Sequence, residues 1–471
     1  MQYISTRGQA PKIGFCDVLL AGLARDGGLY VPETWPKLGE SAVGASAASA
    51  KNSAAASYAQ KAASIMSPFV GAEIDQQIFE KLCAEAYSTF RHPEVAPLVE
   101  IGPNEYLLEL FHGPTLAFKD VALQLVGKLF DHVLMQRNER VMIVGATSGD
   151  TGGAAFDGVA SCRNVDIVML YPNNRVSDVQ RRQMTTLTAP NVHAVAVDGT
   201  FDDCQDLVKA MFNDQKFRDA NQLSAVNSIN WVRVMAQVVY YVTAIEKLGR
   251  AAVFSVPTGN FGNVLAGWIA KQMGAQIEGF VVASNTNDIL TRFFESKQMA
   301  ANEVVPTLSP SMDIQVSSNF ERLLFETNNR DGAKTAKQLT DFRATGKLEV
   351  AASVYQKWFE GVFVGRRCND EQTLATMQDV YKQSAMLIDP HTAVGLSAAR
   401  QSAGVDYPKD MPMITLATAH PAKFPDAVHR ATGQTPKLPE HLADLMSRPE
   451  RSVSLPNDLG AVQAFVASCR K

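Results

Sequence analysis

Short apolar segments alternate with longer amphipathic ones along most of this chain, and that alternation limits the folds open to it. The segments expected to form strands are 106–110, 141–144, 166–171, 192–197, 252–256, 280–283 and 413–416. The segments expected to form helices are one starting near 58, then 75–90, 120–135, 202–212 and one ending near 273. This alternation is typical of parallel sheets covered by helices on both faces. It predicts an α/β fold with two layers, near 141–215 and 251–285, and a cleft between them.

The pattern also suggests how the chain divides. We expect a mostly helical N-terminal region over residues 1–100. A large α/β domain is expected from residues 101–140 together with 240–471, and a small α/β domain from 141–239. Within residues 41–57, 13 of the 17 residues are Ala or Ser. Such a segment buries little apolar surface, so we expect a mobile surface insertion there.

Composition and charge narrow the class of protein. Hydrophobic residues make up 46% and charged residues 20% of the 471, which excludes global disorder. The formal net charge of -4 argues against nucleic-acid or membrane-surface binding. The six cysteines form no CxxC pair. No apolar run reaches 18 residues, and the first 15 residues lack the apolar stretch of a secretory signal. We therefore expect a protein of the reducing cytoplasm.

Two glycine-rich loops follow expected strands and open helices. In 259–263 (GNFGN), glycines allow close backbone approach and the helix N-terminus offers unpaired N–H groups, which together suit a phosphate. A plain turn needing positive φ at Gly or Asn is an equal alternative. In 145–153 (GATSGDTGG) the Lys of a P-loop is absent, so a smaller anion such as a carboxylate fits better. The alternative there is a cluster of helix-capping residues.

Two basic side chains lie near expected helix starts. Arg233 follows Asn227 and Ser228 in a strongly apolar helical pattern, where a guanidinium can hold phosphate with two hydrogen bonds. A surface arginine with a buried stem is the simpler interpretation. Lys119 begins a helix after Gly113-Pro114, and burial beside Phe118 would lower its pKa and supply a nucleophilic amine. A surface lysine is the alternative, and spacing alone does not single out Lys119.

Several longer segments resemble one enzyme family. They are 3–8 (YISTRG), 22–33 (GLARDGGLYVPE), 111–120 (FHGPTLAFKD), 147–151 (TSGDT), 227–233 (NSINWVR), 259–263 (GNFGN), 389–392 (DPHT) and 418–424 (TAHPAKF). Together they are similar to the bacterial and fungal branch of the threonine synthase family, among the fold-type II pyridoxal-phosphate enzymes. The resemblance covers nearly the whole chain apart from the Ala/Ser insertion. It implies two α/β domains with mostly parallel sheets around a cleft.

The resemblance also implies roles for individual residues. Lys119 would bond covalently to pyridoxal 5'-phosphate. The cofactor's phosphate would lie against Gly259, Asn260, Phe261, Gly262 and Asn263, and Thr418 would face its pyridine nitrogen. Asp150 would lie near the cofactor's 3′-oxygen, where many relatives carry Asn. The substrate's carboxylate would bind Thr147, Ser148 and Thr151, and its phosphate Asn227, Ser228 and Arg233.

The implied reaction is the last step of threonine biosynthesis. A carbon–oxygen lyase of this family converts O-phospho-L-homoserine and water to L-threonine and phosphate, by γ-elimination and β-addition of water. We expect a monomer or weak homodimer with no nucleic-acid or membrane partner. His112, His391 and His420 lack metal-ligand spacing, so no metal is expected. Lys423 could help neutralise a phosphate or lie on the surface.

Two other functions remain open from the residues alone. A dehydratase or phospholyase of the same fold would release an oxoacid instead of threonine. A non-catalytic protein could bind a phosphorylated metabolite or nucleotide through the glycine loops.

Overall fold

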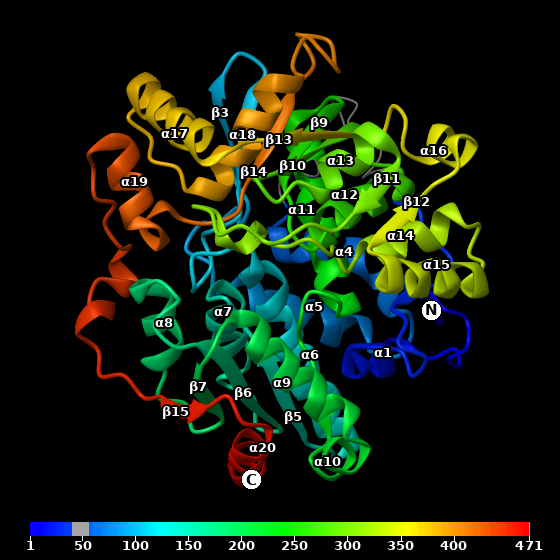
Figure 1. The fold of residues 1–471 in the computed structure, drawn as a ribbon, viewed down its shortest axis with the longest axis vertical. Coiled ribbons are helices and arrows are strands. Elements are labelled where there is room, and N and C mark those ends of the chain that lie inside the picture. The colour runs from blue at the N-terminus through cyan, green and yellow to red at the C-terminus, as the bar shows by residue number, and fades with distance from the viewer. Residues whose placement is uncertain (40–55, 471) are drawn as a thin grey trace.

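The computed structural model describes residues 1–39 and 56–470 of the chain. In Figure 1 two lobes lie one above the other, each built around a sheet with helices against it. Both sheets are wholly or mostly parallel, which confirms the predicted α/β class. Strands and helices agree with the expected segments to within a few residues, because their apolar periodicity is strong in each case.

The smaller main sheet has five strands, all parallel. Their order across the sheet is β15 (Val453–Pro456), β7 (Val192–Asp198), β6 (Val165–Pro172), β5 (Val141–Ala146) and β8 (Leu223–Ser224). Every residue of β6 is buried. This is the pattern expected of a central strand covered on both faces.

The larger sheet has six strands. Their order is β13 (Phe363–Arg367), β10 (Ile277–Ser284), β9 (Ala252–Pro257), β14 (Met413–Ala417), β4 (Glu105–Glu109) and β3 (Leu98–Gly102). All neighbours are parallel except the edge pair β3 and β4. Two short antiparallel ribbons join β1 (Tyr3–Ser5) to β2 (Tyr30–Pro32) and β11 (Gln298–Ala300) to β12 (Lys347–Glu349).

Helices cover both sheets. Up to residue 248 they are α1 (Phe15–Ala21), α4 (Tyr58–Val70), α5 (Gln76–Tyr87), α6 (Lys119–Arg137), α7 (Asp150–Val159), α8 (Asp178–Thr185), α9 (Phe201–Asn213), α10 (Gln215–Ala220) and α11 (Trp231–Leu248). After it come α12 (Gly262–Met273), α13 (Ile289–Ser296), α14 (Phe320–Thr327), α15 (Gly332–Thr345), α16 (Ala352–Trp358), α17 (Asp370–Ser384), α18 (Pro390–Ser402), α19 (Pro425–Thr432) and α20 (Leu459–Cys469). Short 3-10 turns are η1 (Pro310–Met312), η2 (Pro421–Lys423), η3 (Glu440–Leu442) and η4 (Leu445–Ser447).

The helices α6 and α7 cross with their backbones in close contact. A Cβ on Gly158 would lie 2.5 Å from the carbonyl oxygen of Leu123, and a Cβ on Gly127 would overlap the carbonyl of Gly158. Only glycine permits such an approach. Since α6 begins at Lys119 and α7 begins at Asp150, the crossing sets the distance between these two side chains.

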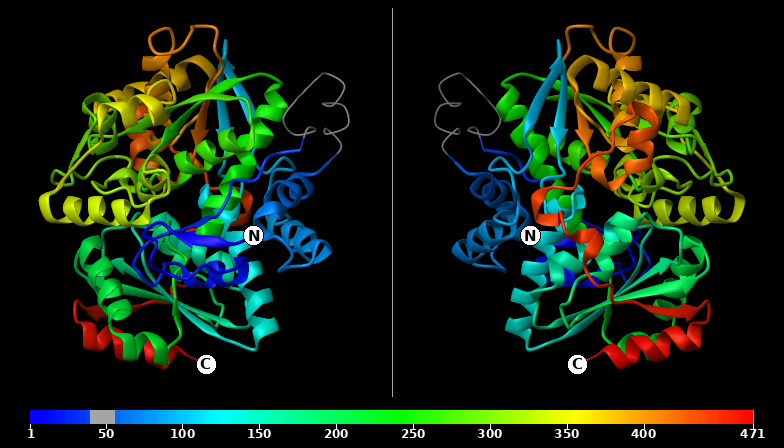
Figure 2. Two further views of the ribbon diagram at one scale, coloured as in Figure 1. Left: turned by 90° about the vertical axis from the view of Figure 1, so that its right-hand side faces the viewer. Right: turned by 90° about the vertical axis from the view of Figure 1, so that its left-hand side faces the viewer.

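The N-terminal region packs against the flank of the molecule, as the two side views in Figure 2 show for α4 and α5. The helix α4 begins with a capping box, in which Ser57 accepts from Gln60 N and the Gln60 side chain accepts from Ser57 N. Ser57 therefore belongs to a helix start, although we expected it within the insertion. The rest of that expected insertion, residues 41–55, lies outside the described residues, and Ala56 only precedes the cap.

The C-terminal segment differs from the expected domain division, which placed 240–471 in one domain. The strand β15 extends the five-stranded sheet beside β7, and α20 buries Val462 and Val466 against the same sheet, at the foot of Figure 1. The physical reason is that the outer edge of β7 is completed by a strand from the end of the chain. No helix of the described residues is long and apolar enough to span a bilayer.

Candidate active site

Lys119 is buried at the first position of α6. Only 8% of the residue is exposed, and its Nζ lies 4.8 Å from the centre of the Phe118 ring. Burial lowers the pKa of Lys119, and Lys423 and Arg233 lower it further, while Asp150 opposes them. Of the two interpretations that the sequence left open, the structure shows the buried amine, and burial shifts Lys119 toward its neutral form.

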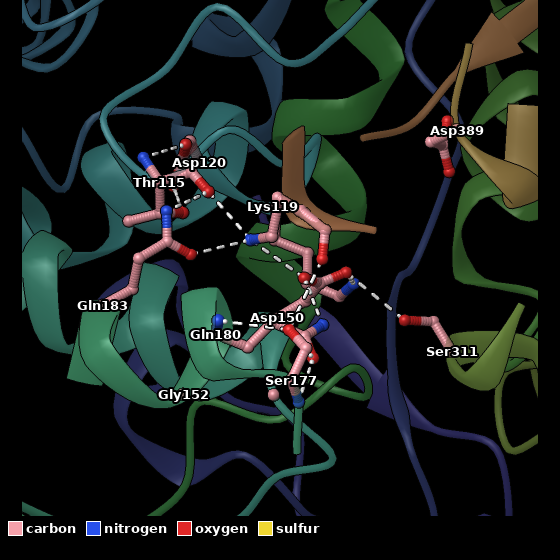
Figure 3. Close-up of polar contacts among 12 residues, drawn as sticks. Thr115, Lys119, Asp120, Asp150, Gly152, Ser177, Gln180, Gln183, Ser311 and Asp389 are labelled. Atoms are coloured by element: carbon pink, nitrogen blue, oxygen red, sulfur yellow. Dashed lines mark hydrogen bonds and ion pairs between the residues drawn. The ribbon is translucent and has the colours of Figure 1, made fainter. Parts of the chain in front are cut away.

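Asp150 is the centre of the polar contacts drawn in Figure 3. Its Oδ2 lies 3.2 Å from Lys119 Nζ and accepts from Ser311 Oγ at 3.3 Å. Its Oδ1 lies 2.9 Å from Lys423 Nζ and accepts from Gln180 Nε2, also at 2.9 Å. Burial alone would raise the pKa of Asp150, but the two ammonium groups, with His391 nearby, hold it well below its ordinary value. The carboxyl group is therefore a buried anion.

The GNFGN loop joins β9 to α12. The residue with positive φ is Phe261 (φ 62), not one of the glycines or asparagines on which the plain-turn alternative relied. A bulky residue in this conformation costs energy, so the surrounding structure must hold it there. The ring of Phe261 is buried against Phe320, which supplies that hold. No side chain caps α12, which leaves its first N–H groups for a ligand.

Asn263, in the first turn of α12, has a buried amide group without a partner. Its Oδ1 accepts from the hydroxyls of Tyr240 and Tyr241, the latter at 2.9 Å. Its Nδ2 is buried and makes no hydrogen bond to the described residues. Because a buried donor left unmade is costly, this group indicates a ligand with an acceptor oxygen.

The loop before α7 is held by hydrogen bonds to Thr147 at the start of the helix. Thr147 is buried, and its Oγ1 accepts from Gly149 N and Gly152 N, both at 2.9 Å. It therefore holds the start of the helix, as the capping alternative predicts. The side chains of Ser148 and Thr151 are half-buried in the same loop.

Arg233 is buried rather than exposed, with 3% of the residue accessible. Its Nη1 donates to Val226 O at 3.0 Å, and its Nε has no partner. No carboxylate within residues 1–39 and 56–470 forms an ion pair with it. Burial lowers the pKa of Arg233 to about 10, so it still carries a charge at neutral pH. Asn227 is exposed and Ser228 half-buried, in the loop just before it.

Two residues that sequence reasoning missed connect the expected sites. Ser311 contacts Asp150, and a Cβ on Gly259 would lie 2.7 Å from its carbonyl oxygen. Asn319 Nδ2 donates to Ser228 O at 3.0 Å and to Asn260 O at 3.1 Å. They bring together loops that are far apart in the chain.

Thr418 and His391 complete the surroundings. Phe118 N donates to Thr418 O at 2.9 Å, which places Thr418 beside the Lys119 helix. His391 Nδ1 lies 2.8 Å from Asp389 Oδ1, and its Nε2 accepts from Ser311 N at 3.2 Å. The segment 389–392 (DPHT) therefore caps α18, and its His391 also holds Ser311. The contact with Ser311 could not be predicted from the sequence.

Lys423 is fully buried, so the surface alternative considered for it is wrong. Gln180 was also missed, although the spacing Ser177-x-x-Gln180 is that of a capping box. The box holds Gln180 Oε1 at the helix start and leaves its Nε2 to donate to Asp150.

Comparison with known proteins agrees with this geometry. Residues 2–87 match the model of the threonine synthase N terminus, 92–344 that of pyridoxal-phosphate dependent enzymes, and 392–466 that of the threonine synthase C-terminal region. A threonine synthase of Pseudomonas aeruginosa is 52% identical over 473 residues, which cover 99% of this chain and 98% of that protein. The chain belongs to the threonine synthase family. The resemblance seen in the motifs is confirmed.

Solved structures of the family have the same fold. A pyridoxal-phosphate-bound threonine synthase from Brucella melitensis is 50% identical, with a TM-score of 0.94 and full coverage of both chains. The threonine synthase from yeast is 38% identical, with a TM-score of 0.91, over 99% of this chain and 98% of its own.

The residues present fit the family's cofactor. Pyridoxal phosphate needs a buried amine for its aldehyde and donors for its phosphate, and Lys119, the uncapped start of α12 and the unpartnered Asn263 Nδ2 offer these. The cofactor expected from the sequence is thus supported by the family and by the donor set.

Proposed function

We propose that this pyridoxal-phosphate-dependent lyase converts O-phospho-L-homoserine and water to L-threonine and phosphate. The choice of a phosphorylated substrate rests on Arg233. Its guanidinium group is buried, has no carboxylate partner and lies near enough to Lys119 to lower the pKa of Lys119. A buried unpaired cation is costly unless a ligand anion meets it. A phosphorylated substrate supplies that anion at a second site, separate from the cofactor's phosphate.

The remaining roles are also proposals. Lys119 would bond to the cofactor, and Thr418 would face its pyridine nitrogen. The residues proposed to hold the cofactor's phosphate are Gly259, Asn260, Phe261, Gly262 and Asn263. The residues proposed to hold the substrate are Thr147, Ser148 and Thr151 for the carboxylate, and Asn227, Ser228 and Arg233 for the phosphate. Asp150 would lie near the cofactor's 3′-oxygen as a charged acceptor.

The chemistry divides between the cofactor and the chain. When bound, pyridoxal phosphate supplies a conjugated system that spreads negative charge developing on the substrate. Lys119 Nζ takes and returns protons at the substrate's α and β carbons, which requires the neutral amine that burial favours. Arg233 holds the phosphate before and after it leaves the γ carbon, and water adds at the β carbon.

Borohydride reduction followed by peptide mapping tests the central residue. The pyridoxyl label should appear on the peptide that contains Lys119 and should be absent from Lys119→Ala. A label on another lysine would reject the assignment.

Product analysis with phosphohomoserine then separates the two catalytic alternatives, since threonine and phosphate in equal amounts support the proposal and 2-oxobutanoate supports a dehydratase. Protein that never forms a labelled lysine would support the non-catalytic alternative.

We also propose a cytoplasmic protein that is a monomer or weak homodimer. All six cysteines are free and buried, which is compatible with a reducing compartment. Most exposed large apolar side chains in the described residues, such as Leu23, Met135, Val405 and Met446, come from separate segments. Analytical ultracentrifugation across a concentration series measures the association state.

A further inference from the structure

Lys423 has no exposed surface, and every donor of its ammonium group has an acceptor. Its Nζ lies 2.9 Å from Asp150 Oδ1, and it donates to Thr115 O at 2.8 Å and to Gln183 Oε1 at 3.0 Å. Gln183 Nε2 donates to the same carbonyl of Thr115 at 3.0 Å. Three saturated contacts in a dry environment fix the position of this charge.

These contacts reach the segment that carries Lys119. Thr115 N donates to Asp120 Oδ2 at 2.8 Å, and Thr115 Oγ1 donates to Asp120 Oδ1 at 2.6 Å, as Figure 3 shows. A Cβ on Gly113 would lie 2.5 Å from Asp120 Oδ2, so the turn is folded tightly onto that carboxyl group. Lys423 therefore touches the turn before Lys119 on one side and Asp150 on the other.

Asp150 needs a counter-ion that remains when Lys119 changes its state. In the proposed function Lys119 Nζ would bond covalently to the cofactor, and it would have to be an uncharged amine whenever it takes a proton from the substrate. A buried carboxylate left without a cation strongly destabilises the fold. Lys423 makes and breaks no bond in that scheme, and its contacts do not involve Lys119.

We propose that Lys423 is a positioning residue, the permanent counter-ion of Asp150 and the clamp that holds the turn before Lys119 against it. The proposal deepens the proposed function and rests on it for the movement of Lys119. It differs from a direct role of Lys423 in binding the substrate's phosphate.

The surrounding charges set the expected effect. Lys423, Asp150 and Lys119 act on one another. The other titratable or charged groups near these three are Asp120, Arg233, His391 and His420. Lys423 repels the charged form of Lys119 and shares the carboxylate of Asp150 with it. Without Lys423, Asp150 pairs with Lys119 alone and holds it more firmly as an ammonium ion.

The first test measures Lys119 in the full-length protein freed of cofactor. Labelling of Lys119 by an amine-specific reagent is followed against pH by peptide mass spectrometry. In Lys423→Met the half-labelling pH should rise by about one unit, since a nearby like charge is removed. Lys423→Arg should stay within about 0.3 units of the parent protein. An unchanged Lys423→Met profile would overturn the proposal.

Lys271→Met is the matched control. Lys271 is a partly buried lysine of α12 whose Nζ donates to the carbonyls of Ile277 and Glu278, with no contact to Asp150. Its loss should leave the labelling profile of Lys119 unchanged. An equal shift in this variant would mean that the effect is not specific to Lys423, and would also overturn the proposal.

A second test stays informative even if Lys423→Met folds poorly. Lys423 and Asp150 are in direct contact, so Asp150→Asn should cost less stability to urea in the Lys423→Met protein than in the parent protein. Additive losses would contradict the counter-ion role.

Kinetics distinguish positioning from substrate binding. Lys423→Met should lower kcat about 10- to 100-fold, with the KM for phosphohomoserine changed less than about 3-fold. A large rise in KM with kcat preserved would instead place Lys423 on the substrate's phosphate. If the product proves not to be threonine, the proposed function fails, while the labelling result still tests Lys423.

Discussion

At the scale of single residues, the site consists of charges that the fold has removed from water. Asp150 is stabilised by two lysines, whereas Arg233 has only a backbone carbonyl and no ion-pair partner in the described residues. This difference in ion pairing indicates different roles for the two side chains. A satisfied charge holds the structure in place, and an unsatisfied one is ready for a ligand.

Replacing Arg233 tests that distinction. Arg233→Met removes a buried, unpaired cation, so its unfolding free energy without ligand should fall by less than about 1 kcal/mol or rise. The parent protein should gain thermal stability as inorganic phosphate is added, because phosphate binds only the folded state, and Arg233→Met should gain much less. The KM for phosphohomoserine should rise at least about 10-fold with cofactor colour intact.

Loss of the cofactor colour in Arg233→Met would show that the two phosphate sites are assigned the wrong way round. Arg322→Met is a comparison, since Arg322 is equally buried but donates to Tyr30 O, Ile229 O and Asn319. That variant should unfold more easily and leave acceptors unpaired.

His420 should make the fold sensitive to acid. Burial, with the nearby His112, lowers the pKa of His420 to about 4 from 6.5, and its Nδ1 accepts from Ala422 N at 3.1 Å. Between pH 4 and pH 6.5 His420 is therefore protonated in the unfolded chain but largely neutral in the folded chain. Stability is full above pH 6.5 and is lost as the pH falls toward 4.

In His420→Asn the amide oxygen can accept the same bond but does not titrate. Urea unfolding measured across this pH range should fall less steeply for the variant than for the parent protein. Parallel curves would show that His420 is not responsible for the acid sensitivity.

At the scale of elements, the contact between α6 and α7 decides where the reactive groups meet. Both helices begin with a charged residue of the site, and Gly127 and Gly158 let the backbones touch. The spacing of Lys119 and Asp150 is thus a property of helix packing rather than of either loop.

Alanine at these glycines should disturb both stability and the site. Gly158→Ala should cost about 1–3 kcal/mol, and Gly127→Ala at least as much, because each methyl group meets a backbone carbonyl that cannot move freely. Thermal unfolding measures the loss. Gly460→Ala, with 3.4 Å to the nearest side-chain atom, should change stability by less than about 0.5 kcal/mol. Equal midpoints for all three would contradict the role of the crossing.

At the scale of the whole molecule, the C-terminal end of the chain supplies the edge strand of a sheet whose other strands come from residues 141–224. Apolar residues of α20 pack in one cluster with Met142, Val144 and Val168 from β5 and β6. The smaller lobe therefore cannot be cut from the chain as residues 141–239 without exposing that cluster.

Substitutions in the C-terminal segment should report this dependence. Val466→Ala removes fully buried methyl groups and should cost about 1–3 kcal/mol. Val453→Ala in β15, 38% exposed, should cost less than about 0.5 kcal/mol. Hydrogen exchange should show faster opening of β7 and α9 in Val466→Ala. Acceleration confined to the larger lobe would contradict the assignment of this segment.

Prediction from sequence succeeded where local patterns suffice. Apolar runs located strands such as β7 (expected 192–197, observed Val192–Asp198) and helices such as α9 (expected 202–212, observed Phe201–Asn213), because side-chain periodicity follows backbone geometry. The resemblance of the motifs identified the family and its cofactor. It did not find Gln180, Ser311 or the saturated contacts of Lys423, since these depend on side chains brought together from distant segments.

The order of amino acids alone thus determined the α/β alternation, the glycine loops after the strands and a lysine at a helix start. Tertiary packing alone decided that Lys119 and Arg233 are buried, that Asp150 lies between two lysines and that the last strand joins the smaller sheet. Local periodicity constrains only neighbours in the chain. The charge state of a side chain depends on how much water and which charges surround it, and only the assembled fold sets both.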